Sequence, residues 1–311
     1  MKTINTDNLT STQQHLIEAA IKATDTAYVP YSKYHVGAAV LTKDGSIFSA
    51  SNVENAAYGS TICAERMAIG KANASGTRDI KAIAISSKSK EFDKVEIASG
   101  PCGSCRQFIY EMSQVSQIDI EVIGSTTNKN HITLTTIEKL LPLRKKRYVD
   151  LNIPSQIHLT DSQNLLIEAA IKATDTAYAP YSKYHVGAAV LTKDGSIFSA
   201  SNVENAAYGS TICAERLAIG NANASGARDI VKIAITSVSD DEKKNKITSD
   251  PCGSCRQFIY EIAQYSGFDI EILMSDFTKN NIIIKSIEQL LPYGFGPSQL
   301  HIDVAKNSLL D

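Results

Sequence analysis

Six cysteines fall into two sets of three with the same spacing. The first set is Cys63, Cys102 and Cys105, and the second is Cys213, Cys252 and Cys255. In each set, two cysteines stand three residues apart at the expected beginning of a helix, so that their sulfurs can converge on one ion. Three thiolates leave the fourth corner of a zinc tetrahedron open for water, which is typical of a catalytic site. The spacing predicts two zinc ions per chain.

A glutamate follows the first cysteine of each set by two residues, as Glu65 and Glu215. A carboxylate beside zinc-bound water can take its proton and pass it to a leaving group, whereas the alternative is a first-turn residue favoured by the helix dipole. Three thiolates cancel the charge of zinc, so positive groups should lie nearby. The candidates are Arg66, Arg106, Arg216 and Arg256.

Two other interpretations of the cysteines are weaker. A redox pair plus a buried cysteine would not explain the third cysteine beside a glutamate. A structural zinc site would need a fourth ligand, for which His35 and His185 are available. Both histidines stand at the expected beginning of a strand, where packing or surface roles are more common.

The elements that must position these residues occur twice, at an offset of 150 residues. Residues 16–66 recur at 166–216 with one difference, Val29 against Ala179. The segment PCGSCRQFIYE also recurs, at Pro101 and Pro251. Each copy has the size of a domain, so the sequence predicts domains at 10–142 and 160–300 with a linker at 143–159. The basic run at 144–147 belongs to this linker and is expected to be solvated.

Within one copy, helical and extended patterns alternate. We expect helices at 12–28, 63–76 and 102–114 and a short one before Pro142, together with a hairpin around Asp44-Gly45 and later strands at 80–86, 118–124 and 131–135. This order predicts two copies of a three-layer α/β/α domain, each with a central mixed sheet.

The composition is that of a globular protein, with 43% hydrophobic and 21% charged residues. A net charge of −2 gives no overall attraction to nucleic acid or to an anionic membrane. No stretch approaches the roughly 18 apolar residues of a membrane-spanning helix, and the polar amino-terminal stretch does not resemble a signal peptide. We expect a cytoplasmic location, where thiols stay reduced and available for metal binding.

Four motifs occur in the same order in each copy: PYSKYHVGAAV, NVENAAYG, CAER and PCGSCRQ. Together they resemble the short cytidine deaminases whose zinc is held by three cysteines. The resemblance implies hydrolytic deamination of cytidine and deoxycytidine in pyrimidine salvage, with zinc-bound hydroxide attacking C4 and Glu65 or Glu215 shuttling protons. It also implies that an asparagine and a glutamate hold the ribose 3′-hydroxyl and that an aromatic ring stacks on the base. The matching residues are Asn52, Glu54, Asn202 and Glu204 for the sugar, and Tyr34 and Tyr184 for the base, where the family usually has phenylalanine.

The two copies differ in their tails. In the family, subunits form a tetramer, and an aromatic residue near the carboxyl end closes a neighbour's site. Phe295 matches that residue, whereas the first tail has no phenylalanine and carries seven extra residues. We expect both copies to bind zinc, the sites capped by the first tail to bind substrate more weakly, and two chains to form a homodimer of four domains.

Three rival functions stay open at this point. An aminohydrolase for another amino-pyrimidine, such as blasticidin, shares the CAE and PCG-x-C motifs but lacks the NVEN arrangement as a family. Editing of nucleic acid conflicts with the charge balance and with a carboxylate placed at the 3′-hydroxyl. A zinc-stabilised binding protein without catalysis would have no need of Glu65 and Glu215. The preference between cytidine and deoxycytidine is not encoded in any motif.

Overall fold

The computed structural model describes residues 2–88, 100–142, 158–242 and 244–300, with 302 and 304. The chain divides into two compact units, Met1–Leu141 and Pro142–Asp311, each with its own hydrophobic core. Most of the expected linker at 143–159, including the basic run at 144–147, lies outside the described residues, so the expected domain boundaries remain a proposal.

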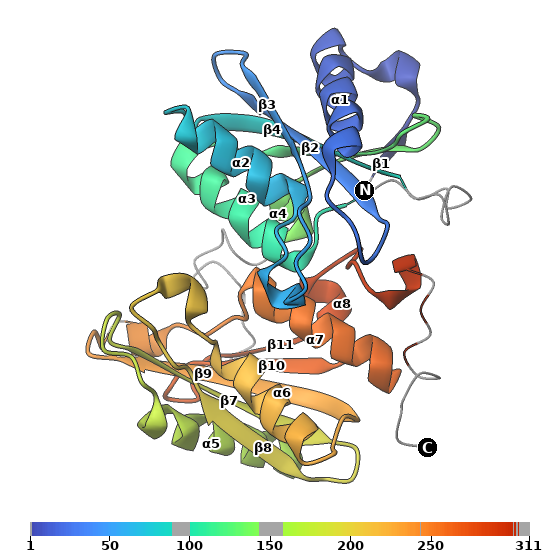
Figure 1. Cartoon of the computed structure of the whole chain (residues 1–311). Helices are drawn as coiled ribbons and strands as arrows, with labels where there is room; N and C mark the ends of the chain where they lie inside the picture. Colours follow the sequence, from blue (N-terminus) through green and yellow to red (C-terminus); the bar gives the residue numbers. More distant parts are fainter. Residues whose placement is uncertain are drawn as a thin grey trace. The chain divides into compact units, whose positions relative to one another are not determined.

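The first unit is built around a mixed sheet of the described strands, in the order β1-β6-β5-β4-β2-β3 (Figure 1). Neighbours β4 and β5 run parallel, and the other neighbouring pairs run antiparallel. The bounds are β1 Lys2–Ile4, α1 Ser11–Ala23, β2 His35–Thr42, β3 Ile47–Ser51, α2 Ala64–Ala74, β4 Ile80–Lys88, α3 Gly103–Ser116, β5 Glu121–Thr126, β6 Ile132–Thr136 and α4 Ile137–Leu140.

The second unit repeats this plan in a sheet of order β11-β10-β9-β7-β8, with β9 and β10 parallel (Figure 1). The bounds are α5 Asp161–Ala173, β7 Tyr184–Thr192, β8 Ile197–Ser201, α6 Ala214–Ala224, β9 Ile230–Ser239, α7 Gly253–Ser266, β10 Glu271–Ser275, β11 Ile282–Ser286 and α8 Ile287–Leu290, followed by a 3-10 turn at Pro297–Leu300.

Helices cover both faces of each sheet, which confirms the three-layer α/β fold. In the first unit, Leu16 and Ile17 of α1 pack against Ala39 and Ala84 on one face. On the other face, α2 and α3 pack against a second set of buried side chains from the same strands, including Val40, Ile83 and Ile85. Alternation of side chains along a strand produces this division between the faces.

The first helix ends earlier than its periodicity predicts, and an additional strand precedes it. Helix α1 begins after a capping box formed by Thr10 and Gln13, and gives way to a 3-10 turn at Thr24–Thr26 rather than continuing to residue 28. The hydroxyl of Thr24 donates to the carbonyl of Ile21 at 2.7 Å, which satisfies a carbonyl at the helix end. The polar amino-terminal stretch was not expected to form a strand, but β1 pairs with β6 through backbone bonds.

Candidate metal centre and surrounding pocket

The beginnings of two helices bring each cysteine set together. Cys63 is the residue before α2, Cys102 is the residue before α3, and Cys105 lies in the first turn of α3. The three sulfurs lie within 4.8 Å of one another, and the sulfurs of Cys213, Cys252 and Cys255 do the same in the second unit. Cys63 and Cys102 are 39 positions apart in the sequence but neighbours in the fold. They lie where the positive ends of two helix dipoles meet.

The sulfur positions fit a zinc ion. The sulfurs of Cys213 and Cys252 are 4.0 Å apart, and those of Cys252 and Cys255 are 3.5 Å apart. Zinc–sulfur bonds of about 2.3 Å in a tetrahedron place sulfurs about 3.8 Å apart, whereas a disulfide would need about 2.05 Å. The two cysteine groups contain no histidine, and Nδ1 of His35 lies 3.3 Å from the carbonyl of Thr24.

The thiols and a nearby guanidinium share polar contacts. Arg66 donates from Nη2 to the carbonyl of Thr61 at 3.0 Å and lies 3.9 Å from the Cys63 sulfur. Hydrogen bonds with Cys105 and Cys63 lower the pKa of Cys102, whereas hydrogen bonds with Cys102 and Cys63 raise the pKa of Cys105. One sulfur of the three therefore carries negative charge most readily, which is the state that a metal ion binds.

Glu65 and Glu215 lie in the first turns of α2 and α6, and each is only 4% exposed. Burial raises the pKa of Glu65 to about 8, and the charge of Cys63 adds to this rise. Burial likewise raises the pKa of Glu215 to about 7, with a further contribution from Cys252. A carboxyl group with such a pKa can gain and lose a proton near neutral pH.

Arg106 and Arg256 are almost completely buried beside the cysteines. Arg106 donates from Nε to the carbonyl of Pro101 at 2.8 Å and from Nη1 to that of Leu140 at 2.8 Å. Its counterpart Arg256 repeats this pattern and also pairs with Asp250 at 3.0 Å. The position of Asp250 is Gly100 in the first copy, a difference that the sequence analysis did not use.

The two candidate base-stacking tyrosines are held through their hydroxyl groups. Tyr34 Oη lies 2.8 Å from Ser87 Oγ at the end of β4. Tyr184 Oη accepts from Ser237 Oγ at 2.5 Å, and Ser249 Oγ contacts Ser237. The sequence analysis did not predict these serines, because the sequence around a serine near a strand end does not indicate its partner. Only the pairing of β2 with β4 brings Ser87 close to Tyr34.

Asn52 and Glu54 use part of their hydrogen-bonding capacity for bonds within the protein. The amide of Asn52 accepts from the backbone N–H of Val36 at 2.9 Å and donates to the carbonyl of Tyr34 at 3.0 Å. The carboxylate of Glu54 accepts from the N–H groups of Tyr31 and Ser32 and from the Ser32 hydroxyl. Asn202 and Glu204 repeat these bonds in the second unit. Both side chains therefore shape the loop that carries the tyrosine.

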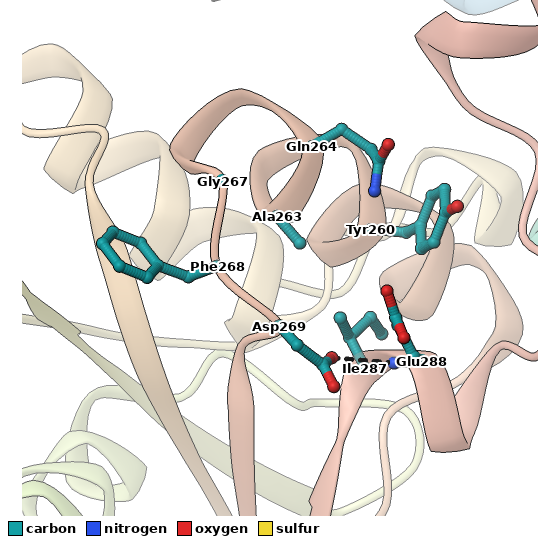
Figure 2. Close-up of a pocket in the computed structure, with 8 residues that line it drawn as sticks. All are labelled: Tyr260, Ala263, Gln264, Gly267, Phe268, Asp269, Ile287 and Glu288. Atoms are coloured by element: carbon teal, nitrogen blue, oxygen red, sulfur yellow. Dashed lines mark hydrogen bonds between the residues drawn. The ribbon is translucent and has the colours of Figure 1, made fainter.

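Phe295 follows α8 in the sequence, and its backbone contacts helix α7 of the same unit. Its carbonyl accepts from Nε2 of Gln257 in α7 at 2.7 Å. A cavity of about 190 Å³ lies beside the same helix, lined in part by Tyr260, Gln264 and Asp269 (Figure 2). It reaches the carboxyl end of α7, whereas Cys252 and Cys255 stand at the beginning of that helix. The cavity is therefore separate from the candidate metal centre.

Comparison with known proteins agrees with this arrangement. A family model described as "Cytidine and deoxycytidylate deaminase zinc-binding region" matches residues 10–120 and again residues 160–266. The two matches together cover more than half of the chain, and each includes one complete set of cysteines. The chain therefore belongs to this family of zinc-binding deaminases.

Several relatives correspond in length to one copy of the repeat. A cytidine deaminase of Halalkalibacterium halodurans is 44% identical over 131 residues, which are 42% of this chain and 91% of the relative. A blasticidin-S deaminase of Bacillus cereus is 34% identical over 146 residues, which are 46% of this chain and 99% of the relative. The crystal structure of a cytidine deaminase from Burkholderia pseudomallei is 38% identical, covers 43% of this chain and 98% of that chain, and has a TM-score of 0.37.

Proposed function

We propose that the enzyme hydrolyses the 4-amino group of cytidine and deoxycytidine, giving uridine or deoxyuridine and ammonia. The observation that carries this proposal is the combination, present in both units, of three convergent cysteines with a buried glutamate. A structural zinc site has four protein ligands, whereas three ligands beside an acid–base group are typical of hydrolytic chemistry.

The six cysteines are the proposed ligands of two zinc ions per chain. Bound there, zinc supplies Lewis acidity and lowers the pKa of water. Glu65 and Glu215 would take up the proton released by the attacking water and pass it to the ring nitrogen. They would then carry the proton of the newly added C4 hydroxyl to the departing amine, which leaves as ammonia as the C4 carbonyl forms. Arg66 and Arg216 would offset the negative charge of the thiolates, because their guanidinium groups are fixed beside them by the carbonyls of Thr61 and Thr211.

The remaining hydrogen-bonding capacity of Asn52 and Glu54 favours a sugar hydroxyl as ligand. A carboxylate has about four acceptor positions and an amide nitrogen has two hydrogens. The bonds to Tyr31, Ser32 and Tyr34 leave room for one more bond at each side chain. A hydroxyl both donates and accepts, so it can use both positions, whereas a phosphate lacks the donor and would meet the carboxylate's charge.

A free nucleoside is therefore the proposed substrate rather than a polynucleotide. The net charge of −2 agrees with a small, uncharged ligand. Tyr34 and Tyr184 would stack on the base, and the bonds of their hydroxyls to Ser87 and Ser237 would fix the orientation of the rings. Phe295 is the proposed aromatic cap.

A role in pyrimidine salvage in the cytoplasm is consistent with this substrate. None of the helices in the described ranges has both the length and the apolar character that spanning a bilayer requires.

A second candidate function is deamination of blasticidin or another substituted amino-pyrimidine, which the similarity to a blasticidin-S deaminase favours. The two functions differ in the group that meets Glu54, because a nucleoside presents a 3′-hydroxyl there. Replacement of Glu54 and Glu204 by glutamine should therefore raise KM for cytidine far more than KM for a substrate without that hydroxyl.

The deciding experiment is ammonia release from cytidine and deoxycytidine by the purified protein, together with a chelator-treated sample and the Glu65→Gln/Glu215→Gln double variant. We expect turnover that chelation abolishes, zinc restores and the double variant lacks. Absence of turnover in protein shown to contain zinc would contradict the proposal and favour either the other pyrimidine substrates or a binding role.

A further inference from the structure

The segment that follows α8 lies so close to α7 that a Cβ atom at either of two glycines would require the ring of Tyr260 to move. A Cβ atom added to Gly294 would lie 2.8 Å from the ring of Tyr260, and one added to Gly296 would also lie 2.8 Å from that ring. Such a distance is far below ordinary contact between carbon atoms. Two glycines therefore allow the backbone on either side of Phe295 to rest on the tyrosine ring.

Further contacts fix the same segment. Nε2 of Gln257 donates to the carbonyl of Phe295 at 2.7 Å, and the N–H of Gly296 donates to Gln299 at 2.8 Å. Tyr293 has a φ of +55°, a left-handed conformation that is unfavourable for a tyrosine, and its side chain is exposed. A strained residue of this kind persists only where its surroundings determine it, and here it turns the chain onto α7.

Helix α7 connects this segment to the candidate metal centre. Cys252 and Cys255 stand at its beginning, and Arg256, which follows directly, donates to the carbonyl of Leu290 at the end of α8. Gln257 and Tyr260 occupy the next turn of the same helix. Tyr260 also lines the cavity of Figure 2, so its ring has a rigid helix behind it and the tail segment beside it.

We infer that Gln257 and Tyr260 are positioning residues, which clamp the backbone around Phe295 onto the helix that carries two of the three cysteines. The two copies differ in the glycines on which the clamp depends. The first copy retains Gln107 and Tyr110, but the residues at the positions of Gly294 and Gly296 are Arg144 and Lys146, and no glycine occurs at 143–157.

This inference rests on the proposed function only in its kinetic consequence. If Phe295 contacts a bound nucleoside, the clamp determines how rigidly that ring is presented, and its loss raises KM because the tail must be ordered when substrate binds. The conformational part concerns the chain itself and is independent of any substrate.

Hydrogen exchange in the full-length, zinc-loaded protein tests the conformational part. In Gln257→Ala, we expect peptides covering 293–297 to exchange about three- to tenfold faster, as the loss of one hydrogen bond implies. The matched control is Gln107→Ala, which removes the same side chain from the first copy and should leave these peptides unchanged. Equal exchange in the two variants would overturn the clamp.

A steric cycle tests the role of the tyrosine ring. Gly294→Ala should accelerate exchange of the tail in the wild type and should add nothing in a Tyr260→Ala background, where the obstructing ring is gone. Tyr260→Phe retains the ring, so Gly294→Ala should keep its effect in that background. An effect of Gly294→Ala that is the same with and without the ring would contradict the inference.

Kinetics of nucleoside deamination test the functional part. Gln257→Ala should raise KM about three- to tenfold with kcat within twofold. A tail that loosens without a change in KM would show that the clamp does not position a substrate-contacting group. If the wild type does not deaminate nucleosides, the proposed function fails, but the exchange experiments still decide whether the clamp exists.

Discussion

At the scale of single residues, the two units place the same chemical groups in the same surroundings. The convergent cysteines, the buried glutamate and the arginine bonded to a backbone carbonyl recur in both units. The two units differ in the residues around these groups, with Gly100 in the first copy where the second has Asp250, and in their tails. Residue-scale chemistry thus predicts two competent sites, and differences in substrate binding have to arise from their surroundings.

Single replacement of each glutamate tests this division. Because general acid–base catalysis contributes roughly 10²- to 10⁴-fold, Glu65→Gln and Glu215→Gln should each silence one site and leave the activity of the other. We expect the residual KM values to differ between the two variants, since Phe295 is proposed to cap only one class of site. Steady-state kinetics of each variant with cytidine gives the measurement, and identical residual kinetics would argue against unequal sites.

At the scale of elements, the close approach of α1 to β2 sets the geometry of the first unit. A Cβ atom added to Gly37 in β2 would lie 2.1 Å from the carbonyl oxygen of Ala20 in α1, and Gly187 meets Ala170 in the same way. The backbone of the strand therefore touches the backbone of the helix. This contact positions the beginning of β2, which carries the loop of the candidate base-stacking tyrosine.

Replacement of Gly37 should accordingly destabilise the first unit. We expect Gly37→Ala to lower the free energy of unfolding by about 1–3 kcal/mol, the usual effect of overpacking. The control is Gly70→Ala in α2, where a Cβ atom meets nothing within 4 Å and alanine favours the helix by about 0.5–1 kcal/mol. Chemical denaturation gives the stabilities, and hydrogen exchange assigns the weakened unit. A tolerated Gly37→Ala would mean that α1 can move away from the sheet.

A second prediction at this scale concerns an ion pair between neighbouring strands of the second unit. Lys232 in β9 lies 2.6 Å from Glu271 in β10, where the first copy has Ala82 in place of the lysine. Partial burial pushes the pKa of Glu271 upward, but the hydrogen bonds from Lys232 and Gln163 outweigh it, and the pKa is lowered overall. A lowered carboxyl pKa stabilises the folded state above the ordinary pKa of glutamate, about 4.3, and this contribution is lost as the pH falls through the lowered value.

Lys232→Ala should therefore reduce the stability of the second unit at pH 7 by about 0.5–1 kcal/mol, the range of partly exposed ion pairs. The difference from the wild type should shrink as the pH falls below about 4. Denaturation at several pH values measures it, with Lys232→Ala in a Glu271→Gln background as the control, where the loss should be small. A pH-independent difference would indicate that packing of the lysine stem, not its charge, stabilises the strands.

At the scale of the whole molecule, each unit leaves the same large apolar side chains exposed. Tyr58 is 72% exposed in the first unit, and its counterpart Tyr208 is 74% exposed in the second. Tyr28, Val53 and Ile62 are also exposed, and isolated β-bridges from Val53 to Tyr28 and to Ile62 place these three side by side. Exposed apolar faces of this kind are typical of surfaces that associate, and a face that occurs on every unit suits symmetric pairing.

We therefore expect two chains to associate into a homodimer of four domains. Light scattering of the purified protein should give twice the 33.6 kDa of one chain. Tyr58→Asp/Tyr208→Asp should shift the mass towards that of one chain, because a charge in the apolar face opposes its burial. A mass of one chain for the wild type would contradict this assembly.

Local pattern alone determined much of this protein. The repeat at an offset of 150 residues, the two sets of cysteines with their glutamates, and the order of helices and strands are visible in the sequence. These features are visible because each depends on residues that are close together in the sequence. This holds for helix and strand periodicity and for the spacing of metal ligands. Strand β1 was not predicted because it depends on pairing with the distant β6. The early end of α1 was not predicted because hydrophobic periodicity does not register the 3-10 turn at Thr24–Thr26 or the bond from Thr24 to the carbonyl of Ile21.

Only the tertiary structure decided which partners the polar groups take. Glu54 is bonded to Ser32 and Asn52 to Tyr34, Ser87 holds a tyrosine hydroxyl, and Arg256 pairs with Asp250. Residue type leaves several partners open for each of these groups, and the choice among them follows from strand register and from the packing of helices on the sheet. The contact of the second tail with α7 belongs to the same class. Gly294 and Gly296 can be read from the sequence, but only the fold brings the ring of Tyr260 close to them.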